Sequence, residues 1–309
     1  MSIAQGLVLW SSGMAPLHVV LALLVAVIWG LAFVATRIAL DVVSPPQLTA
    51  LRFLVAAVPA LWLARPPVPW GALMVAGLFL FAGQFLLQFF GITLGMPPGL
   101  ASIMIQTQAL FTIVFSALIL GERPSVRQWT GTAVAFAGLA FIAATVGHDL
   151  TTIGFSLTGL AAVSFGVGNV LVKRLPPVDA LHLVIWLSLV PPVPSLALSI
   201  LLDGPRAIVT ALAAASWLQL GSILYLGVVA TVLAYAIWGW LLRRYAVATV
   251  TPFALLAPFV AAFASSLVFG ERFGGLRLAG MALVMLGLAV IVTSGRDALS
   301  SQPMPTETR

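Results

Sequence analysis

Long apolar stretches alternate with short polar ones along the whole chain. Within each stretch the apolar residues are continuous, whereas the strands of a membrane β-barrel would alternate apolar and polar residues. A bilayer-spanning helix needs about 20 mostly apolar residues. Ten stretches of this kind are bounded by Pro, Gly or charged residues: 17–36, 47–64, 70–92, 99–120, 127–146, 154–173, 182–202, 217–241, 247–269 and 276–294. The pattern predicts an all-α integral membrane protein with ten transmembrane helices and short loops.

The composition excludes a soluble protein. Of the 309 residues, 61% are hydrophobic and 7% are charged, and the mean hydropathy is +1.15. Soluble domains carry about 25% charged residues, and no compact soluble fold could hide so much apolar surface. The net charge of +6 comes from scattered Lys and Arg residues without a basic patch, so nucleic acid is not an expected partner. Because cysteine is absent, disulfides, thiol catalysis and Cys-ligated metal are excluded.

The distribution of basic residues predicts the orientation in the membrane, since Lys and Arg concentrate in cytoplasmic loops. If the N-terminus lies inside, nine of the 14 basic residues lie at cytoplasmic helix ends: Arg65, Arg123, Arg127, Lys173, Arg174, Arg243, Arg244, Arg296 and Arg309. The other five lie at outer helix ends: Arg37, Arg52, Arg206, Arg272 and Arg277. The excess predicts that both termini are cytoplasmic.

The chain also repeats itself, because residues 118–142 resemble residues 267–291 at a constant offset of 149. Three groups of residues coincide at this offset: Gly121-Glu122-Arg123 with Gly270-Glu271-Arg272, Gly131 with Gly280, and Gly138 with Gly287. The chain therefore divides into two five-helix halves, 1–147 and 148–309. Five is an odd number, so the second half enters the membrane from the opposite side and the repeats are inverted. Inverted repeats around a site near the midplane are typical of secondary transporters.

The starts of the two halves match more weakly. Trp29-Gly30 with Arg37 corresponds to Phe165-Gly166 with Lys173.

Each Gly-Glu-Arg group lies between two predicted helices, which allows two interpretations. The glutamate could couple transport to an ion, or the three residues could form a turn in which Gly supplies backbone freedom and the charges reach the interface. The second, structural interpretation is favoured.

No predicted helix has a carboxylate at its centre, so the usual buried proton relay is missing. The three histidines, His18, His148 and His182, lie at helix ends and far apart in the sequence. Neither a metal site nor a set of catalytic residues can be assembled from them. The sequence thus predicts no metal, no cofactor and no enzyme activity, and it predicts a central site without fixed charge.

Neutral polar and aromatic residues do occur inside the predicted helices. Amides in hydrocarbon are costly unless they are paired, so each glutamine either bonds to a neighbouring helix or lines a wet cavity, and both alternatives stay open. The candidate substrate-binding residues are Gln84, Gln88, Gln106, Gln108, Trp29, Phe165, Asn169, Tyr235 and Trp238. Amides and aromatic rings suit a small solute without net charge, such as a zwitterionic amino acid.

Several segments resemble a known family. VIWGLAFVATRIAL at 27–40, together with the Gly-Glu-Arg turn after the fourth helix of each half, is similar to the EamA family of the drug/metabolite transporter superfamily. Two segments are more similar still to bacterial exporters of O-acetylserine and cysteine: LGMPPGLASIMIQTQALFTIVFSALILGER at 94–123 and YLGVVATVLAYAIWGWLLRRY at 225–245. Exporters of aromatic amino acids resemble the chain more distantly.

The resemblance implies a basket-like bundle in the bacterial inner membrane. Its third, fourth, eighth and ninth helices would line a central cavity, and its first and sixth helices would move. Gln106 and Gln108 stand where aromatic amino acid exporters carry aromatic residues, which favours smaller polar substrates. The expected function is therefore alternating-access export of small amino acids and related metabolites through the lipid bilayer, with protons as a candidate coupling ion. A passive channel and an exporter specific for aromatic amino acids are the alternatives.

Overall fold

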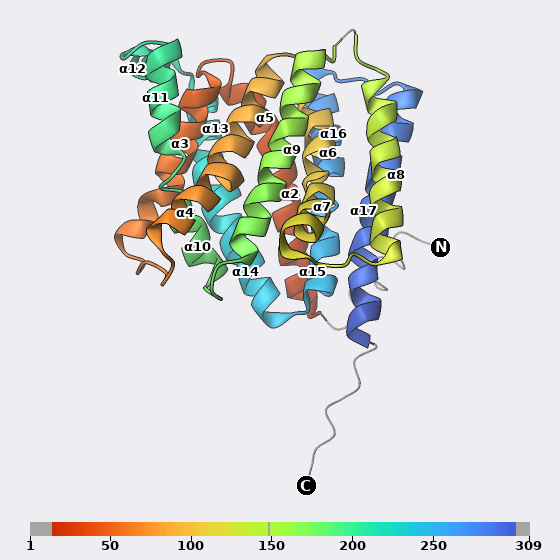
Figure 1. The fold of residues 1–309 in the computed structure, drawn as a ribbon. Coiled ribbons are helices and arrows are strands. Elements are labelled where there is room, and N and C mark those ends of the chain that lie inside the picture. The colour runs from red at the N-terminus through yellow and green to blue at the C-terminus, as the bar shows by residue number, and fades with distance from the viewer. Residues whose placement is uncertain (1–13, 148, 301–309) are drawn as a thin grey trace.

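The computed structural model describes residues 14–147 and 149–300, and in this part of the chain the secondary structure is helical, without strands (Figure 1). The first 13 residues, His148 and the end of the polar tail, 301–309, lie outside the described residues. The predicted all-α class is confirmed.

Among the described residues, eight helical segments are long and apolar enough to cross a bilayer: Pro16–Ala39, Trp70–Thr93, Pro98–Leu120, Thr152–Lys173, Ala180–Leu202, Trp217–Arg244, Thr249–Phe269 and Gly275–Thr293. The other two predicted spans coincide with α3 (Pro45–Ala57), which continues into the 3-10 turn η1 (Val58–Leu61), and with α8 (Val126–Ala143). α3 is short and carries a charge, and α8 begins with a polar turn. Length and composition therefore identify eight membrane spans, and the predicted count of ten is not reached by this criterion.

Three of the eight spans are continuous helices: α2 (Pro16–Ala39), α9 (Thr152–Lys173) and α17 (Gly275–Ser300). The remaining five are built from several pieces. The pieces, in chain order, are α4 (Trp70–Gly77), η2 (Leu78–Gly83) and α5 (Gln84–Thr93); α6 (Pro98–Gln106) and α7 (Gln108–Leu120); α10 (Ala180–Leu187) and α11 (Pro192–Leu202); α13 (Trp217–Leu224), η3 (Tyr225–Leu233) and α14 (Ala234–Arg244); and α15 (Val247–Ala254) and α16 (Ala257–Phe269). A short helix, α12 (Ala207–Ala214), connects α11 with α13.

The interruptions fall at matching places of the two halves. Thr107 separates α6 from α7, and Leu255 and Leu256 separate α15 from α16; Thr107 and Leu256 are 149 residues apart. The π-helical segments η2 and η3 also coincide at this offset. Such irregular turns loosen the regular ladder of backbone hydrogen bonds and are frequent at functional sites. The repeat found in the sequence therefore extends to the local backbone geometry.

The packing of the helices follows the same repeat. α8 packs against α17, α2 against α16, and α9 against α7, and α8 and α17 run in opposite directions (Figure 1). A Cβ atom added to Gly30 on α2 would lie 2.6 Å from the Cβ of Val260 on α16. A Cβ added to Gly166 on α9 would lie 2.7 Å from the Cβ of Phe111 on α7. The first helix of each half thus packs closely against the fourth helix of the other half.

The two Gly-Glu-Arg groups form turns, as the structural interpretation predicts. Gly121 and Gly270 each have a φ of +68° and end α7 and α16 in the left-handed conformation, which glycine adopts without steric cost. The glutamates that follow have different partners. Glu122 forms an ion pair with Lys173 at 3.1 Å, whereas Glu271 accepts a hydrogen bond from the backbone N–H of Gly99 at 3.1 Å.

Candidate functional site

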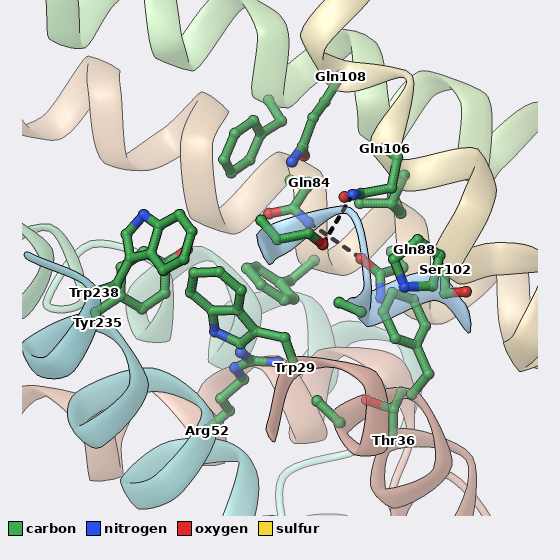
Figure 2. Close-up of a pocket in the computed structure, with 18 residues that line it drawn as sticks. Trp29, Thr36, Arg52, Gln84, Gln88, Ser102, Gln106, Gln108, Tyr235 and Trp238 are labelled. Carbon is green, nitrogen blue, oxygen red and sulfur yellow. Dashed lines mark hydrogen bonds between the residues drawn. The ribbon is translucent and has the colours of Figure 1, made fainter. Parts of the chain in front are cut away.

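A cavity of about 290 Å³ lies where the broken and continuous helices meet (Figure 2). Its wall includes side chains from α2, α3, α5, α6, α7, α9, α14 and α16. Eight of the nine candidate residues from the sequence line this cavity: Trp29, Gln84, Gln88, Gln106, Gln108, Phe165, Tyr235 and Trp238. Residues that lie more than 200 positions apart in the chain therefore share one wall.

Asn169, the ninth candidate, does not line the cavity. Its side-chain Nδ2 donates a hydrogen bond to the Oγ1 of Thr112 at 3.0 Å, which joins α9 to α7. Asn169 lies one helical turn after Phe165 and faces α7. Its amide therefore forms an interhelical hydrogen bond. The structure therefore does not bring Asn169 together with the other eight candidates, and its role in substrate binding stays a prediction.

The four glutamines combine the two roles that the sequence left open. The Nε2 of Gln84 donates to the Oε1 of Gln88 at 3.1 Å, and the Nε2 of Gln106 donates to the carbonyl oxygen of Ala254 at 3.5 Å. The Oε1 atoms of Gln84 and Gln108 are buried without a hydrogen-bond partner among the described residues. A buried acceptor without a partner costs about 1–3 kcal/mol. These two oxygens therefore favour a bound molecule that can donate hydrogen bonds.

Three aromatic side chains form one side of the cavity (Figure 2). The ring centroid of Trp29 lies 5.5 Å from that of Tyr235 and 5.1 Å from that of Trp238, with tilted ring planes. The indole Nε1 of Trp29 donates to the carbonyl oxygen of Ala230 at 3.2 Å, in the π-helical segment η3. Tyr235 and Trp238 are three residues apart on α14, so they share one helix face. This hydrogen bond and these ring contacts fix the position of the aromatic wall.

The cavity also contains a charge that the sequence interpretation missed. Arg52, expected at an outer helix end, lies within α3, is only 6% exposed and lines the cavity. Its Nε donates to the Oγ1 of Thr231 at 3.2 Å, and its guanidinium carbon lies 4.2 Å from the ring centroid of Phe85. The expectation of a site without fixed charge is therefore wrong. The signal was available, because Arg52 is the sixth residue of the apolar stretch 47–64 rather than a residue at its edge.

Two small polar residues complete the wall, namely Thr36 on α2 and Ser102 on α6. Both are buried, and the hydroxyl of Ser102 donates to the carbonyl oxygen of Gly99 at 2.6 Å. Serine and threonine are common in membrane helices, where they bond to their own backbone, so no sequence signal distinguished these two. Within the described residues, His, Cys, Asp and Glu do not gather in a group of three that could hold a metal ion.

Comparison with known proteins gives a consistent result. The sequence pattern of the EamA-like transporter family matches residues 16–144 and again residues 152–293. A protein of Salmonella typhimurium named "Probable amino-acid metabolite efflux pump" is 41% identical over 88% of this chain and 93% of its own length. Its namesake in Escherichia coli K12 is 39% identical over 88% of this chain and 94% of its own length.

Two further matches are more distant. A "Probable terminal-alkyne amino-acid exporter" of Streptantibioticus cattleyicolor is 31% identical over 91% of this chain and 95% of its own length. A crystal structure of another protein superposes with a TM-score of 0.60 at 21% identity, covering 90% of this chain and 97% of that one. At this identity the structural match concerns the fold alone. The family resemblance seen in the sequence is confirmed by the sequence matches.

Proposed function

Because this chain belongs to the EamA-like transporter family, we propose that it exports small amino acids and related metabolites, cysteine and O-acetylserine among them, by alternating access. The names of its bacterial relatives support an exporter of amino-acid metabolites in the bacterial inner membrane rather than an enzyme. The observation that carries the proposal is the convergence of four glutamines and three aromatic wall residues from both halves on one cavity.

The size and lining of the cavity favour a small polar substrate. Its volume of about 290 Å³ lies just below the range of about 300–1,000 Å³ for small-molecule pockets. The amides of Gln106 and Gln108 occupy the side opposite the tryptophans in Figure 2. Amides can form the hydrogen bonds that a polar solute otherwise makes with water. The aromatic ring of a substrate would offer these amides no such hydrogen bonds. Small amino acids therefore rank above aromatic ones.

The proposed membrane architecture has ten spans in two inverted halves, 1–147 and 148–309, with both termini in the cytoplasm. α3 and α8 supply the two spans that fall short by length or composition. The antiparallel packing of α8 on α17 supports the inversion, as do the matching interruptions in the two halves. Transporters built in this way exchange the conformations of their halves around a central site.

Unequal ends of the bundle support alternating access. At one end, the Nζ of Lys173 bonds to the Oγ of Ser116 at 3.0 Å and to Glu122. The equivalent group at the other end is Arg37 with Ser265 and Glu271, at offsets of 136 and 149 residues. These three side chains do not bond to one another within the described structure. Instead, Arg37 pairs with Asp41, Glu271 accepts a hydrogen bond from Gly99, and the Oγ of Ser265 is buried without a partner in the described part of the chain.

A cavity of about 660 Å³ lies at this second end, and both Arg37 and Glu271 line it. At one end the three equivalent side chains are bonded to one another, and at the other end they are separated. One state of an alternating-access cycle requires such a difference between the two ends. In the opposite state, Arg37 would bond to Ser265 and Glu271, and Lys173 would release Glu122.

The proposal is tested by transport in proteoliposomes loaded with a panel of all amino acids and O-acetylserine, with and without an imposed pH gradient. Export of a small amino acid beyond equilibrium is expected. A flux that only ever approaches equilibrium under every pH or voltage gradient would support the passive channel instead, and preferential export of aromatic amino acids would support the other alternative. Gln106→Ala and Gln108→Ala should each reduce export more than Gln128→Ala, because Gln128 caps α8 away from the cavity.

A further inference from the structure

Arg52 is a buried cation without an ionic partner among the residues that the structure describes. Its guanidinium makes one hydrogen bond, through Nε to Thr231, and lies against the ring of Phe85. Neither Nη1 nor Nη2 bonds to any residue that the structure describes. An arginine stays protonated even when it is buried. A buried charge is costly unless it is paired and hydrogen-bonded, so the cavity wall carries an unsatisfied positive charge.

Six carboxylates have side chains that the structure describes, and none of the six can fill this role, because each is engaged elsewhere. Four of them belong to ion pairs: Asp41 with Arg37, Glu122 with Lys173, Asp179 with Arg243, and Asp149 with Arg277. The carboxylate of Asp203 accepts from Ser44, Gln47 and Ser199, and that of Glu271 accepts from Gly99. None of these six carboxylates therefore supplies the counter-charge of Arg52.

The same cavity contains the opposite kind of unsatisfied group. The Oε1 atoms of Gln84 and Gln108 are buried acceptors without donors among the described residues. A cation with free N–H groups and two amide oxygens without donors thus line one small cavity (Figure 2). A planar guanidinium matches the geometry of a carboxylate through two parallel hydrogen bonds. An ammonium has three donors to offer and no acceptor.

From this arrangement, and resting on the function proposed above, we infer that Arg52 binds the carboxylate of an α-amino acid while Gln84 and Gln108 accept hydrogen bonds from its ammonium. The ligand class is therefore a free zwitterion with an unblocked carboxylate. The side chain of the amino acid would face the rings of Trp29 and Trp238. Esters, amides and amines without a carboxylate would leave the guanidinium unpaired and would be rejected for that reason.

The test measures binding to the purified full-length protein in detergent by isothermal titration calorimetry, so that no transport step is required. L-cysteine is compared with its methyl ester, with cysteamine, which lacks the carboxylate, and with 3-mercaptopropionate, which lacks the amino group. The chain contains no cysteine, so these thiols cannot form mixed disulfides with it. The wild-type protein should bind L-cysteine at least about tenfold more tightly than the ester or cysteamine, as a charge-assisted pair predicts.

Two variants assign this discrimination to residues. In Arg52→Gln, the affinities for L-cysteine and its methyl ester should converge to within about threefold, whereas Arg52→Lys should keep part of the difference, because lysine retains the charge but not the planar two-bond geometry. In Gln108→Leu, binding of L-cysteine should weaken while binding of 3-mercaptopropionate should not change. The Arg52→Lys protein controls for folding, because it keeps the charge and most of the volume.

The outcomes separate the inference from the proposed function. An unchanged preference for L-cysteine over its ester in Arg52→Gln, or equal affinity of the wild-type protein for the two, would overturn the inference while leaving amino acid export intact. A wild-type protein that neither binds the four compounds nor exports amino acids would overturn the proposed function, and the inference with it.

Discussion

Gly131 on α8 lies directly against Gly287 on α17: a Cβ atom added to Gly131 would be 2.6 Å from the carbonyl oxygen of Gly287. A Cβ atom added to Gly138 would likewise be 2.6 Å from the carbonyl oxygen of Gly280. Because Gly131 corresponds to Gly280 and Gly138 to Gly287 in the repeat, the first contact is converted into the second when the halves are exchanged. Reciprocal contacts of this kind are the mark of a two-fold relationship.

This contact makes the four glycines essential to the packing of α8 on α17, so Gly131→Ala should destabilise the protein by about 1–3 kcal/mol, the usual cost of overpacking. Gly280→Ala should cost a similar amount, because the two sites are equivalent. The measurement is the apparent melting temperature of the purified protein in detergent. Gly71→Ala is the matched control: Gly71 is a helical glycine with no atom within 4 Å of an added Cβ, and its replacement should not lower the melting temperature. Equal melting temperatures for all three variants would contradict this role.

The ion pair between Lys173 and Glu122 should hold one end of the bundle together in the observed state. Because both side chains are about half exposed, the pair contributes at most about 1 kcal/mol, and Lys173→Met should shift the two-state equilibrium by no more than about fivefold. Since the chain has no cysteine, paired cysteines can report on this shift. Cysteines at positions 173 and 122 should cross-link at rest, while cysteines at 37 and 271 should cross-link mainly during transport or in the presence of Lys173→Met.

A control pair with cysteines at 37 and 203 should not cross-link in either condition. Asp203 lies at the same end of the bundle but bonds to Ser44 and Ser199. If the pair at 37 and 271 never cross-links during turnover, the proposed opposite state, in which Arg37 bonds to Glu271 and Lys173 releases Glu122, is refuted.

Much of this arrangement could be predicted from the sequence, because bilayers impose simple rules. Helix positions follow from runs of about 20 apolar residues, and the internal repeat follows from glycines that a helix crossing cannot replace. The glutamines were identifiable as site candidates because an amide inside hydrocarbon needs a specific reason. Eight of the nine candidates reach one cavity, since all but Asn169 lie on helix faces that turn toward it.

The remaining features depend on tertiary contacts that no local rule encodes. The position of Arg52 inside an apolar stretch marks it as unusual, but only the packing of α3 against η3 places it beside Thr231 in the cavity wall. The break between α6 and α7 occurs at Thr107 without a proline or glycine there, so periodicity predicts a continuous helix at this point. Asn169 satisfies the rule for buried amides through Thr112, and the sequence cannot tell such a pairing from a cavity position.

The aromatic wall should set the size of the substrate. Trp29→Ala removes the ring that contacts both Tyr235 and Trp238, which enlarges the cavity and removes apolar contact area. Affinity for a small amino acid should fall by about tenfold, since a lost ring contact is worth about 0.5–1.5 kcal/mol beyond its buried area. Phenylalanine should begin to compete. The measurement is inhibition of the export of a labelled small amino acid by an excess of phenylalanine.

Trp240→Ala provides the comparison, because the ring of Trp240 packs against His18 at 4.8 Å and does not line the cavity. Its replacement should leave the ratio of small to aromatic substrates unchanged. A change of selectivity in Trp240→Ala equal to that in Trp29→Ala would indicate a general loosening of the bundle instead of a local change in cavity size.

Glu271 has an environment that makes it sensitive to pH near neutrality. It lies in the turn between α16 and α17, and burial raises the pKa of its carboxyl from 4.5 to about 7. The backbone N–H of Gly99 and the guanidinium of Arg277 lower this pKa, and the carboxylate of Asp149 raises it. Arg37 and the exposed Arg272 line the same cavity as Glu271. In the opposite state of the proposed cycle, direct pairing with Arg37 would lower the pKa of the same carboxyl.

The sign of the pH effect follows from this difference. Between the two pKa values the observed state holds a proton that the opposite state has released. Raising the pH toward about 7 on the face of Glu271 should therefore favour the state in which Glu271 pairs with Arg37, by at most about tenfold per pH unit, and the effect should level off above pH 7. Cysteine cross-linking at 37 and 271 cannot report this pH effect, because it would replace the carboxyl of Glu271. The measurement is therefore the export rate in proteoliposomes as the pH on that face varies. The slope near pH 7 should disappear in Glu271→Gln and persist in Glu122→Gln, whose carboxylate is already paired with Lys173. A slope that survives in Glu271→Gln would assign the proton to another group.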